Sequence, residues 1–279
     1  MQKRIFGITG REVAVIGQGT WHIHTAGRRV SVAAIQSGIE LGMTHIDTAE
    51  LYDGAETIVA EAIAGRRDEV FVVSKVLPQN ASRRATIRAC EQSLQRLRIE
   101  RLDCYLLHWR GRHPLADTIA AFEELKQQGK ILAWGVSNFD VSDLDEAVGL
   151  AGEGRIACNQ VLYHLGERAI EHAVLPWCEK HDVALVGYSP FGQGSFPRAQ
   201  SHEGQVLDAI ATAHDATPRQ VALAFLTRRA PLFAIPKASR LEHTTENARA
   251  ADLRLTDQEL ARLEKTFPRS GPPRSLPMG

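Results

Sequence analysis

Short apolar runs and longer helical patterns alternate along almost the whole chain, and this rhythm constrains the fold more than any other feature. Runs of strand character occur at residues 13–21, 44–49, 70–76, 102–109, 131–138, 155–161, 183–189 and 232–238. Between them, the segments 31–42, 56–67, 83–98 and 117–130 place apolar residues at i, i+3, i+4 and i+7, the period of an amphipathic helix. Asp117 is placed to cap the helix that follows it.

Strict alternation of strands and helices predicts a parallel sheet with helical crossovers. Eight such units in 279 residues favour a closed (β/α)8 barrel, the TIM barrel, over an open sheet. No GxGxxG follows any of the strands, which argues against a doubly wound dinucleotide-binding fold. We therefore predict one α/β domain over residues 1–279. It begins with a β-hairpin turning around Thr9-Gly10 and ends in an irregular Pro-rich tail over residues 267–279.

Charge and cysteine content narrow the classes of partner. Lys plus Arg number 33 and Asp plus Glu number 33, so no overall field favours nucleic acid or an anionic membrane. Four cysteines occur without CxxC spacing, and Cys104 and Cys158 lie inside apolar runs, which predicts reduced, buried thiols. The first residues lack the apolar stretch of a signal peptide. We therefore expect a cytoplasmic protein that engages neither nucleic acid nor membrane.

Polar side chains gather where the predicted strands end. In a barrel the loops after the strands build the active site, so these side chains should share one mouth. The set comprises Gly19, Thr20, Trp21, Asp47, Ser74, Lys75, His108, Trp109, Ser137, Asn138, Asn159, Gln160, Tyr188 and Lys237. Each alone has an ordinary structural explanation, such as a solvated lysine or a hydrogen-bonded core histidine. Together, at successive strand ends, they indicate a catalytic site.

Tyr52, in the segment HIDTAELYDGAE, is the candidate proton donor. A phenol has an ordinary pKa of about 10, and a nearby cation lowers it by stabilising the phenolate. Lys75 can supply that cation, and Asp47 can hold Lys75 in place. His108 can donate a second hydrogen bond to the same substrate oxygen. The set predicts carbonyl reduction with a Tyr52 of depressed pKa.

Reduction requires a hydride donor, and because no side chain provides one, we expect a nicotinamide cofactor. A carboxamide needs neutral donors and acceptors, which Ser137, Asn138, Asn159 and Gln160 can offer. Tyr188 can stack on one face of the nicotinamide ring.

The motifs and their order resemble those of the aldo-keto reductase family over nearly the whole chain. The matching segments are GQGTW, DTAELYDGAE, SKV, LLHW, GVSNF, NQVLYH, YSPFG and IPKASRLEHTTEN. They are most similar to the bacterial branch, including methylglyoxal-reductase-like members. The resemblance implies a barrel closed at the bottom by the N-terminal hairpin and an NADPH-dependent reduction of small aldehydes or ketones. It also implies a monomer.

The resemblance assigns roles to individual residues. The implied catalytic residues are Asp47, Tyr52, Lys75 and His108, with Tyr52 as the general acid. The implied cofactor-binding residues are Gly19, Thr20, Ser137, Asn138, Gln160, Tyr188, Ser189, Phe191, Gly192, Lys237, Ala238, Ser239, Arg240, His243, Glu246 and Asn247. Trp21 and Trp109 match aromatic positions of the substrate pocket. The loop 189–204 has a length that suits a lid over the cofactor pyrophosphate.

Two departures from the family pattern bear on cofactor choice. Ala238 stands where many NADPH-dependent members carry Ser, and His243 stands where they carry Arg. An imidazole is a weaker phosphate ligand than a guanidinium, although Arg240 can compensate. We therefore expect NADPH, with NADH as the alternative.

Other functions compete with a reductase. A cofactor-binding regulatory protein on the same scaffold is the main alternative, because a fold alone does not establish activity. A barrel glycosidase would need a second carboxylate at a strand end, and the chain shows only Asp47 there. His22 and His24 could pair on a metal, but no third ligand is evident, so we predict no metal site and place them in a loop near the pocket.

Overall fold

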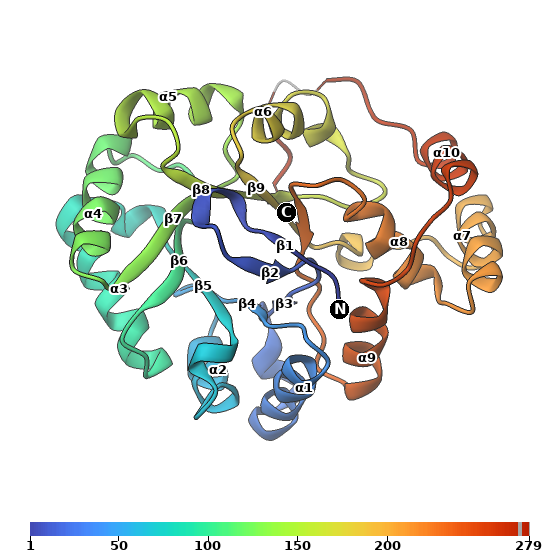
Figure 1. Cartoon of the computed structure of the whole chain (residues 1–279), viewed down its shortest axis with the longest axis horizontal. Coiled ribbons are helices and arrows are strands. Elements are labelled where there is room, and N and C mark those ends of the chain that lie inside the picture. Colours follow the sequence, from blue (N-terminus) through green and yellow to red (C-terminus); the bar gives the residue numbers. More distant parts are fainter. Residues whose placement is uncertain (273–274, 279) are drawn as a thin grey trace.

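The computed structural model, which describes residues 1–272 and 275–278, rolls eight parallel strands into a barrel (Figure 1). The strands are β3 (Gln18–Gly19), β4 (His45–Asp47), β5 (Phe71–Val76), β6 (Leu102–Leu107), β7 (Ile131–Ser137), β8 (Ile156–Leu162), β9 (Ala184–Tyr188) and β10 (Leu232–Ala234). They pair in chain order from β3 to β10. Two backbone bonds join the ends: Gly17 N–H donates to the Ala234 carbonyl at 2.8 Å, and Gly19 N–H to the Pro236 carbonyl at 3.1 Å. The predicted barrel is confirmed.

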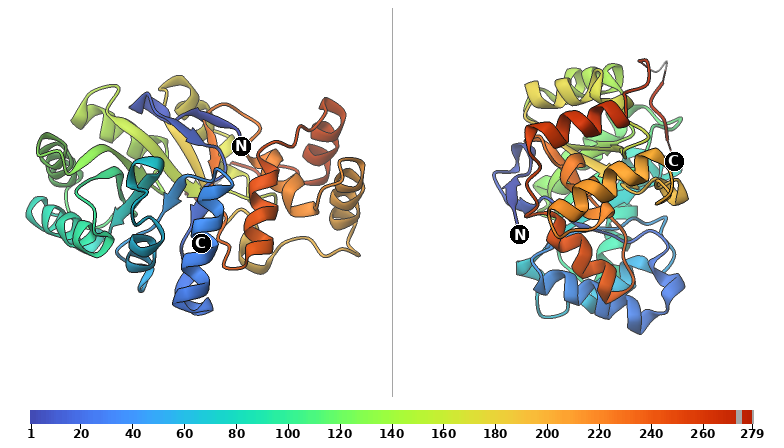
Figure 2. Two further views of the ribbon diagram at one scale, coloured as in Figure 1. Left: turned by 60° about the horizontal axis from the view of Figure 1, so that its bottom comes forward. Right: turned by 90° about the vertical axis from the view of Figure 1, so that its right-hand side faces the viewer.

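Helices surround the barrel, as the side views show (Figure 2). The α-helices are α1 (Arg28–Glu40), α2 (Ala55–Ala62), α3 (Arg83–Leu97), α4 (Leu115–Gln127), α5 (Val141–Ala151), α6 (Val174–Lys180), α7 (His202–Ala213), α8 (Pro218–Leu226), α9 (Leu241–Ala250) and α10 (Asp257–Thr266). The 3-10 turns are η1 (Gly7–Thr9), η2 (Ile23–Ala26), η3 (Arg67–Glu69), η4 (Pro78–Asn80), η5 (Ala169–Glu171) and η6 (Gly192–Gly194). The predicted cap at Asp117 is wrong, because α4 already begins at Leu115 and Asp117 lies in its first turn.

The N-terminal hairpin closes one end of the barrel. Strands β1 (Lys3–Ile5) and β2 (Glu12–Ala14) pair antiparallel, and Gly10 takes the left-handed φ of 67° that the turn between them needs. Between these strands, the Phe6 ring lies 4.8 Å from the Phe71 ring of β5 and 5.1 Å from the Phe233 ring of β10. The predicted strand 13–21 is therefore divided. Its first residues belong to the hairpin, and only its later residues belong to the barrel.

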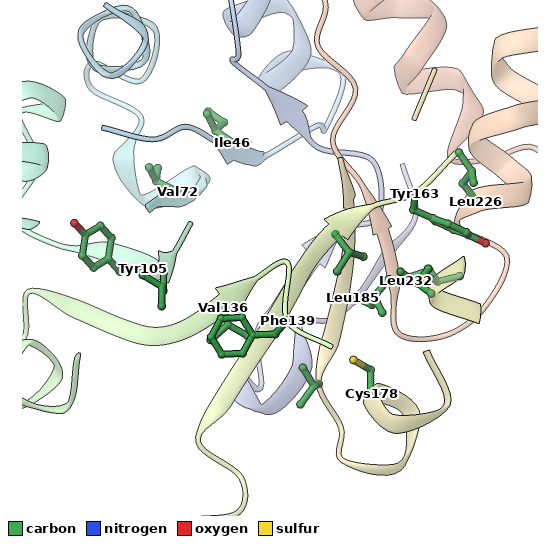
Figure 3. Close-up of a cluster of buried hydrophobic side chains, with 14 of the residues drawn as sticks. Ile46, Val72, Tyr105, Val136, Phe139, Tyr163, Cys178, Leu185, Leu226 and Leu232 are labelled. Carbon is green, nitrogen blue, oxygen red and sulfur yellow. The ribbon is translucent and has the colours of Figure 1, made fainter. Parts of the chain in front are cut away.

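The main core lies between the strands and the surrounding helices. Figure 3 shows side chains of this cluster, among them Val136, Phe139 and Leu185, which are nearly inaccessible to solvent. All four cysteines are free and buried, so Cys104 and Cys158 lie in the core as predicted. Within the described part of the chain, no helix has the length and apolarity to cross a membrane.

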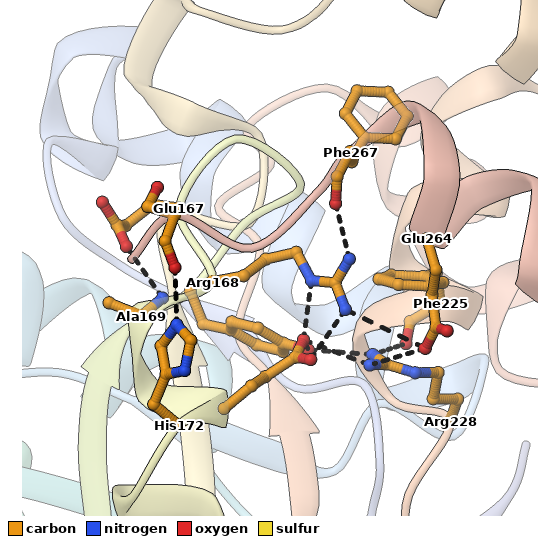
Figure 4. Close-up of polar contacts among 11 residues, drawn as sticks. Glu167, Arg168, Ala169, His172, Phe225, Arg228, Glu264 and Phe267 are labelled. Carbon is orange, nitrogen blue, oxygen red and sulfur yellow. Dashed lines mark hydrogen bonds and ion pairs between the residues drawn. The ribbon is translucent and has the colours of Figure 1, made fainter. Parts of the chain in front are cut away.

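A buried cluster of charges fastens the C-terminal segment to the barrel (Figure 4). Arg168, 3% exposed, donates to the Phe267 carbonyl at 2.6 Å and holds the Glu171 carboxylate through two bonds of 2.8 and 2.7 Å. Arg228 reaches the same carboxylate at 3.1 Å. Beyond Phe267, the described residues up to Met278 form neither helix nor strand, and residues 273, 274 and 279 of the predicted tail lie outside the described residues.

Candidate active site

Asp47 and Lys75 form a buried ion pair on neighbouring strands. Their side chains, from the end of β4 and from β5, are 1% and 0% exposed. Lys75 Nζ lies 2.5 Å from Asp47 Oδ1 and donates to the Thr48 carbonyl at 2.8 Å. Gln160 Nε2 donates to the other carboxylate oxygen of Asp47 at 2.7 Å. These contacts replace the water that both charges lose on burial.

Tyr52 and His108 lie beside this pair. Lys75 Nζ is 3.5 Å from the Tyr52 hydroxyl. The Tyr52 and His108 rings meet edge to face, with centroids 5.7 Å apart and an angle of 77° between the planes. The structure thus brings together the four predicted catalytic residues, which come from three successive strands and the loops after them.

The environment sets the protonation state of each group. Burial lowers the pKa of Lys75, but the Asp47 carboxylate and the Tyr52 hydroxyl together outweigh burial and hold that pKa above its ordinary value. Burial raises the pKa of Tyr52, and the Lys75 charge opposes this rise without reversing it. The predicted depression of the Tyr52 pKa is therefore wrong, and Tyr52 is a neutral phenol at pH 7. Burial and the Lys75 charge lower the pKa of His108 to about 3, so its imidazole is neutral.

A group of neutral polar side chains adjoins the catalytic residues. Ser137 Oγ donates to the Gln160 carbonyl at 2.8 Å, and Asn138 Nδ2 donates to the His108 carbonyl at 3.1 Å. The Tyr188 hydroxyl donates to Asn138 Oδ1 at 2.9 Å. Asn138 adopts a left-handed φ of 62°, a conformation that Asn tolerates better than most residues. The ends of β7, β8 and β9 are thereby held in register around one polar surface.

Asn159 has a different role from the one its position suggested. Its side-chain amide donates to the Phe139 carbonyl at 2.9 Å and accepts from the Phe139 N–H at 3.4 Å. The amide therefore fixes the backbone of the loop after β7, and Asn159 does not line the pocket described next.

A pocket of about 280 Å³ opens beside Tyr52. It is lined by Trp21, Leu51, Tyr52, His108, Trp109, Ser137, Asn138, Tyr188, Ser189, Gln193 and Met278. Sequence reasoning missed Leu51, Gln193 and Met278. Leu51 and Gln193 are neighbours in sequence of Tyr52 and Gly192, which was an available signal. Met278 had no local signal, because it belongs to the tail.

The loop after β9 bends sharply at the rim of this pocket. Ser189 and Gly192 take left-handed φ values of 50° and 67°. Gln193 Nε2 donates to Ser189 Oγ at 2.9 Å, and Ser195 Oγ donates to the Gly192 carbonyl at 2.7 Å. Phe191 lies within this turn, and the centre of its ring is 5.8 Å from that of the Phe196 ring. The first residues of the segment predicted to act as a lid thus form a hydrogen-bonded turn.

The other predicted cofactor residues do not line the pocket. Gly19 lies at the barrel seam, and Thr20 Oγ1 donates to the Asp47 carbonyl at 2.9 Å. The segment after β10 and the helix α9 carry Lys237, Ala238, Ser239, Arg240, His243, Glu246 and Asn247. Lys237, Arg240 and His243 are exposed, whereas Asn247 is 3% exposed. The exposed Lys237 and Arg240 side chains and the buried Asn247 amide form a second part of the candidate cofactor site.

His22 lies beside Trp21, which lines the pocket, and His24 lies beside His22. Their rings are 6.1 Å apart, and His22 packs 4.3 Å from Trp21. Among the residues that the structure describes, no group of three or more His, Cys, Asp or Glu side chains is arranged to hold a metal ion.

The chemistry of these residues suits a nicotinamide dinucleotide. The Ser137 hydroxyl and Asn138 amide offer the neutral donors and acceptors of a carboxamide site, and the Tyr188 ring lines the same pocket. The exposed cations Lys237 and Arg240 suit phosphate groups. The residues present therefore fit this cofactor.

Comparison with known proteins supports this assignment. The chain is 44% identical over 273 residues to the methylglyoxal reductase YeaE of Escherichia coli strain K12, covering 96% of both chains. It is 31% identical over 258 residues to the glyoxal reductase of Bacillus subtilis strain 168, covering 91% of this chain and 89% of that protein.

Solved structures agree with the sequence comparisons. An aldo-keto reductase from Klebsiella pneumoniae, in complex with NADPH, superposes with a TM-score of 0.92 at 43% identity and full coverage of both chains. The model of the aldo/keto reductase family matches residues 15–267, which include all the predicted catalytic residues. The chain belongs to the aldo/keto reductase family.

Proposed function

We propose that Tyr52 protonates the oxygen of a small aldehyde or ketone bound in the 280 Å³ pocket. Family membership fixes the reaction class: the chain is an oxidoreductase that reduces carbonyl compounds with NADPH. The observation that carries the role of Tyr52 is the continuous contact from Asp47 through Lys75 to the Tyr52 hydroxyl. Nothing in the site favours the regulatory alternative.

Tyr52, Lys75 and His108 have different roles in the proposed reaction. NADPH, when bound, supplies the hydride that adds to the carbonyl carbon. Tyr52 holds its proton at neutral pH because burial raises its pKa, so the acid is ready before the reaction. As the proton leaves, negative charge develops on the phenol oxygen, and the Lys75 ammonium 3.5 Å away stabilises it. The neutral His108 imidazole donates a hydrogen bond to the substrate oxygen and thereby orients the carbonyl.

Cofactor binding involves both parts of the candidate site. Ser137, Asn138 and Gln160 bind the nicotinamide carboxamide, and Tyr188 stacks on the ring. Gly19 and Thr20 shape the floor, and Ser189, Phe191 and Gly192 cover the pyrophosphate. The adenosine end is bound by Lys237, Ala238, Ser239, Arg240, His243, Glu246 and Asn247. The exposed Lys237 and Arg240 favour NADPH over NADH, because only NADPH carries a third phosphate.

The substrate class follows from the pocket and the relatives. Trp21, Leu51 and Trp109 give the pocket apolar walls, and its volume of about 280 Å³ suits a small molecule. Two relatives are named as a methylglyoxal reductase and a glyoxal reductase. Methylglyoxal and similar reactive aldehydes are the proposed substrates.

We infer the domain organisation, oligomeric state and compartment of the protein from its sequence and its thiols. Residues 1–279 form one domain that acts as a cytoplasmic monomer. The four free, buried thiols suit a reducing compartment, and the balanced charge gives no basis for nucleic-acid binding. Light scattering of the purified protein tests the monomer, since a mass near twice 30.7 kDa would contradict it.

The decisive test of the proton donor is Tyr52→Phe. NADPH oxidation with methylglyoxal should fall by a factor of about 100 or more, because the general acid is lost, while NADP⁺ affinity stays near that of the wild type. Tyr105→Phe is the matched control. It removes another buried tyrosine hydroxyl, one without a hydrogen-bond partner among the described residues, and should leave turnover unchanged. Unchanged turnover in Tyr52→Phe would refute the role of Tyr52.

A further inference from the structure

Arg219 lies where the loop after β9 meets helix α8, and sequence reasoning assigned it no role. Its guanidinium carbon is 5.6 Å from the centre of the Phe191 ring and 5.0 Å from that of Phe196. The two rings meet edge to face at 83°. Contacts of this kind hold an arginine in place, since a guanidinium packs favourably against aromatic faces. The exposed Arg219 is thereby fixed against the proposed lid.

The same turn of the chain also contacts the adenosine part of the candidate site. Thr217 Oγ1 donates to the Glu246 carboxylate at 2.5 Å. Gln220 Nε2 donates to the Glu246 carbonyl at 2.9 Å. Residues 217–220 thus bridge the lid at Phe191 and helix α9 at Glu246, two parts of the proposed cofactor site that are 55 positions apart in sequence. Arg219 lies in the middle of this bridge.

The charge of Arg219 is uncompensated. Within the part of the chain that the structure describes, the guanidinium has no ion pair and no hydrogen bond, and its contacts are the two ring faces. The nearby Glu246 carboxylate is engaged by Thr217. The N–H groups at the edge of the guanidinium are therefore free to bind an anion while its face stays on the rings.

We propose that Arg219 binds a phosphate group of the dinucleotide cofactor and couples that contact to the lid. The inference rests on the proposed cofactor site and adds a ligand to it. A guanidinium suits a phosphate because it offers paired N–H donors and a permanent charge. The lid rings preorganise the side chain, so less conformational freedom is lost on binding. Phosphate binding at Arg219 would in turn hold Phe191 and Phe196 in the arrangement that the structure shows.

The test compares cofactor affinities of the wild type, Arg219→Gln and Arg262→Gln, using isothermal titration calorimetry with NADP⁺ and with NAD⁺. Arg262→Gln is the matched control, because it removes an exposed arginine from α10. Arg219→Gln should bind NADP⁺ roughly 10- to 100-fold more weakly, the usual cost of a lost charge-assisted hydrogen bond. The loss should shrink as salt is raised. Thermal unfolding confirms that each variant is folded.

Comparing the affinities for NADP⁺ and NAD⁺ identifies which phosphate group Arg219 binds. A loss confined to NADP⁺ assigns Arg219 to the 2′-phosphate, and an equal loss for both cofactors assigns it to the pyrophosphate. Arg219→Gln binding both cofactors as tightly as Arg262→Gln overturns the inference alone. A wild type that binds neither cofactor overturns the proposed function as well.

Phe196→Leu separates a phosphate contact from a packing role. This variant keeps the charge of Arg219 and removes one of its ring contacts, so NADP⁺ affinity should fall by less than about threefold, the weight of one exposed cation–π contact. If Phe196→Leu weakens NADP⁺ as much as Arg219→Gln does, and independently of salt, Arg219 serves only to pack the lid and the inference is wrong.

Discussion

Lys75 lies 2.5 Å from the Asp47 carboxylate and 3.5 Å from the Tyr52 hydroxyl, so its buried charge interacts more strongly with the carboxylate than with the phenol. In the resting protein the Asp47 carboxylate pairs with the Lys75 ammonium, and burial keeps Tyr52 protonated. Charge that develops on the Tyr52 oxygen during proton transfer then lies beside an ammonium already in place. This arrangement needs no reorganisation at the moment of reaction.

Lys75→Met should cost both stability and activity. The substitution leaves the Asp47 carboxylate buried with its bond to Gln160 as the one remaining hydrogen bond among the described residues. Breaking a buried pair in this way destabilises by about 3–5 kcal/mol. Turnover should fall about 100-fold or more, because the phenolate loses its counter-charge. Urea unfolding and NADPH oxidation measure the two effects.

The pH dependence of that stability loss identifies its cause. Burial raises the pKa of Asp47, so acid protonates the stranded carboxyl and removes the buried charge. The stability deficit of Lys75→Met should therefore be smaller at pH 5 than at pH 7. Lys265→Met, which removes an exposed lysine of α10, should show little effect at either pH. An equal deficit at both pH values would point to lost packing instead.

The pH profile of reduction should be flat through neutrality. His108, with a pKa of about 3, stays neutral down to strongly acidic pH, so its charge does not change through neutrality. Tyr52 must be protonated to act, so activity should decline only as pH rises through its raised pKa, above the ordinary value of about 10. Measurement of kcat/KM between pH 5 and 9 tests this. A step near pH 6.5 would show that His108 titrates in the working range and would contradict the assignment.

The catalytic set could be predicted from sequence because each member stands at a fixed place in the repeating unit. Parallel strands bring their carboxyl ends to one mouth, so Asp47, Lys75 and His108 had to meet once the alternation of strands and helices was recognised. The sign of the Tyr52 pKa shift could not be predicted in this way. It depends on how far burial outweighs one cation, and that balance is set by packing from the whole barrel.

Long-range contacts explain the other failures. The run 13–21 has uniform strand character, but Phe6 packing against Phe71 and Phe233 draws its first residues into the hairpin. Met278 reaches the pocket because Arg168 holds the Phe267 carbonyl and His172 lies 2.6 Å from the Ser270 carbonyl oxygen. No local pattern near Met278 encodes these anchors, which lie about 100 residues earlier in the chain.

The buried cluster around Glu171 should govern acid stability. Burial alone would raise the pKa of Glu171, but hydrogen bonds from Arg168 and Tyr163 and the charge of Arg228 lower it to about 2. A depressed carboxyl stabilises the fold above its unfolded pKa of about 4.3, and that stabilisation, on the order of 3 kcal/mol, is lost as pH falls toward 2.

Glu171→Gln should therefore be less stable than the wild type at pH 7, and the gap should close as pH falls from 4.5 to 2. Glu264→Gln is the control. Its carboxylate lies 3.8 Å from Arg228 but is 55% exposed, so the change should cost less than about 1 kcal/mol. Urea unfolding at several pH values measures both. A gap in Glu171→Gln that does not depend on pH would show that Glu171 acts through packing rather than charge.

Met278 should set the preference for large substrates. Its side chain lines the pocket but is 61% exposed, which places it at the rim, where only a long substrate can reach it. Met278→Ala should raise KM for a bulky aromatic aldehyde about fivefold, since a contact burying about 40 Å² of apolar surface is worth about 1 kcal/mol. The KM for methylglyoxal and kcat for both substrates should stay within about twofold, because neither the small substrate nor the reacting atoms touch the rim.

Leu150→Ala, which removes a comparably exposed apolar side chain from α5, is the matched control and should change neither KM. Equal changes in KM for both aldehydes would show that Met278 acts on the whole pocket, and no change for either would show that the tail leaves the mouth open in solution.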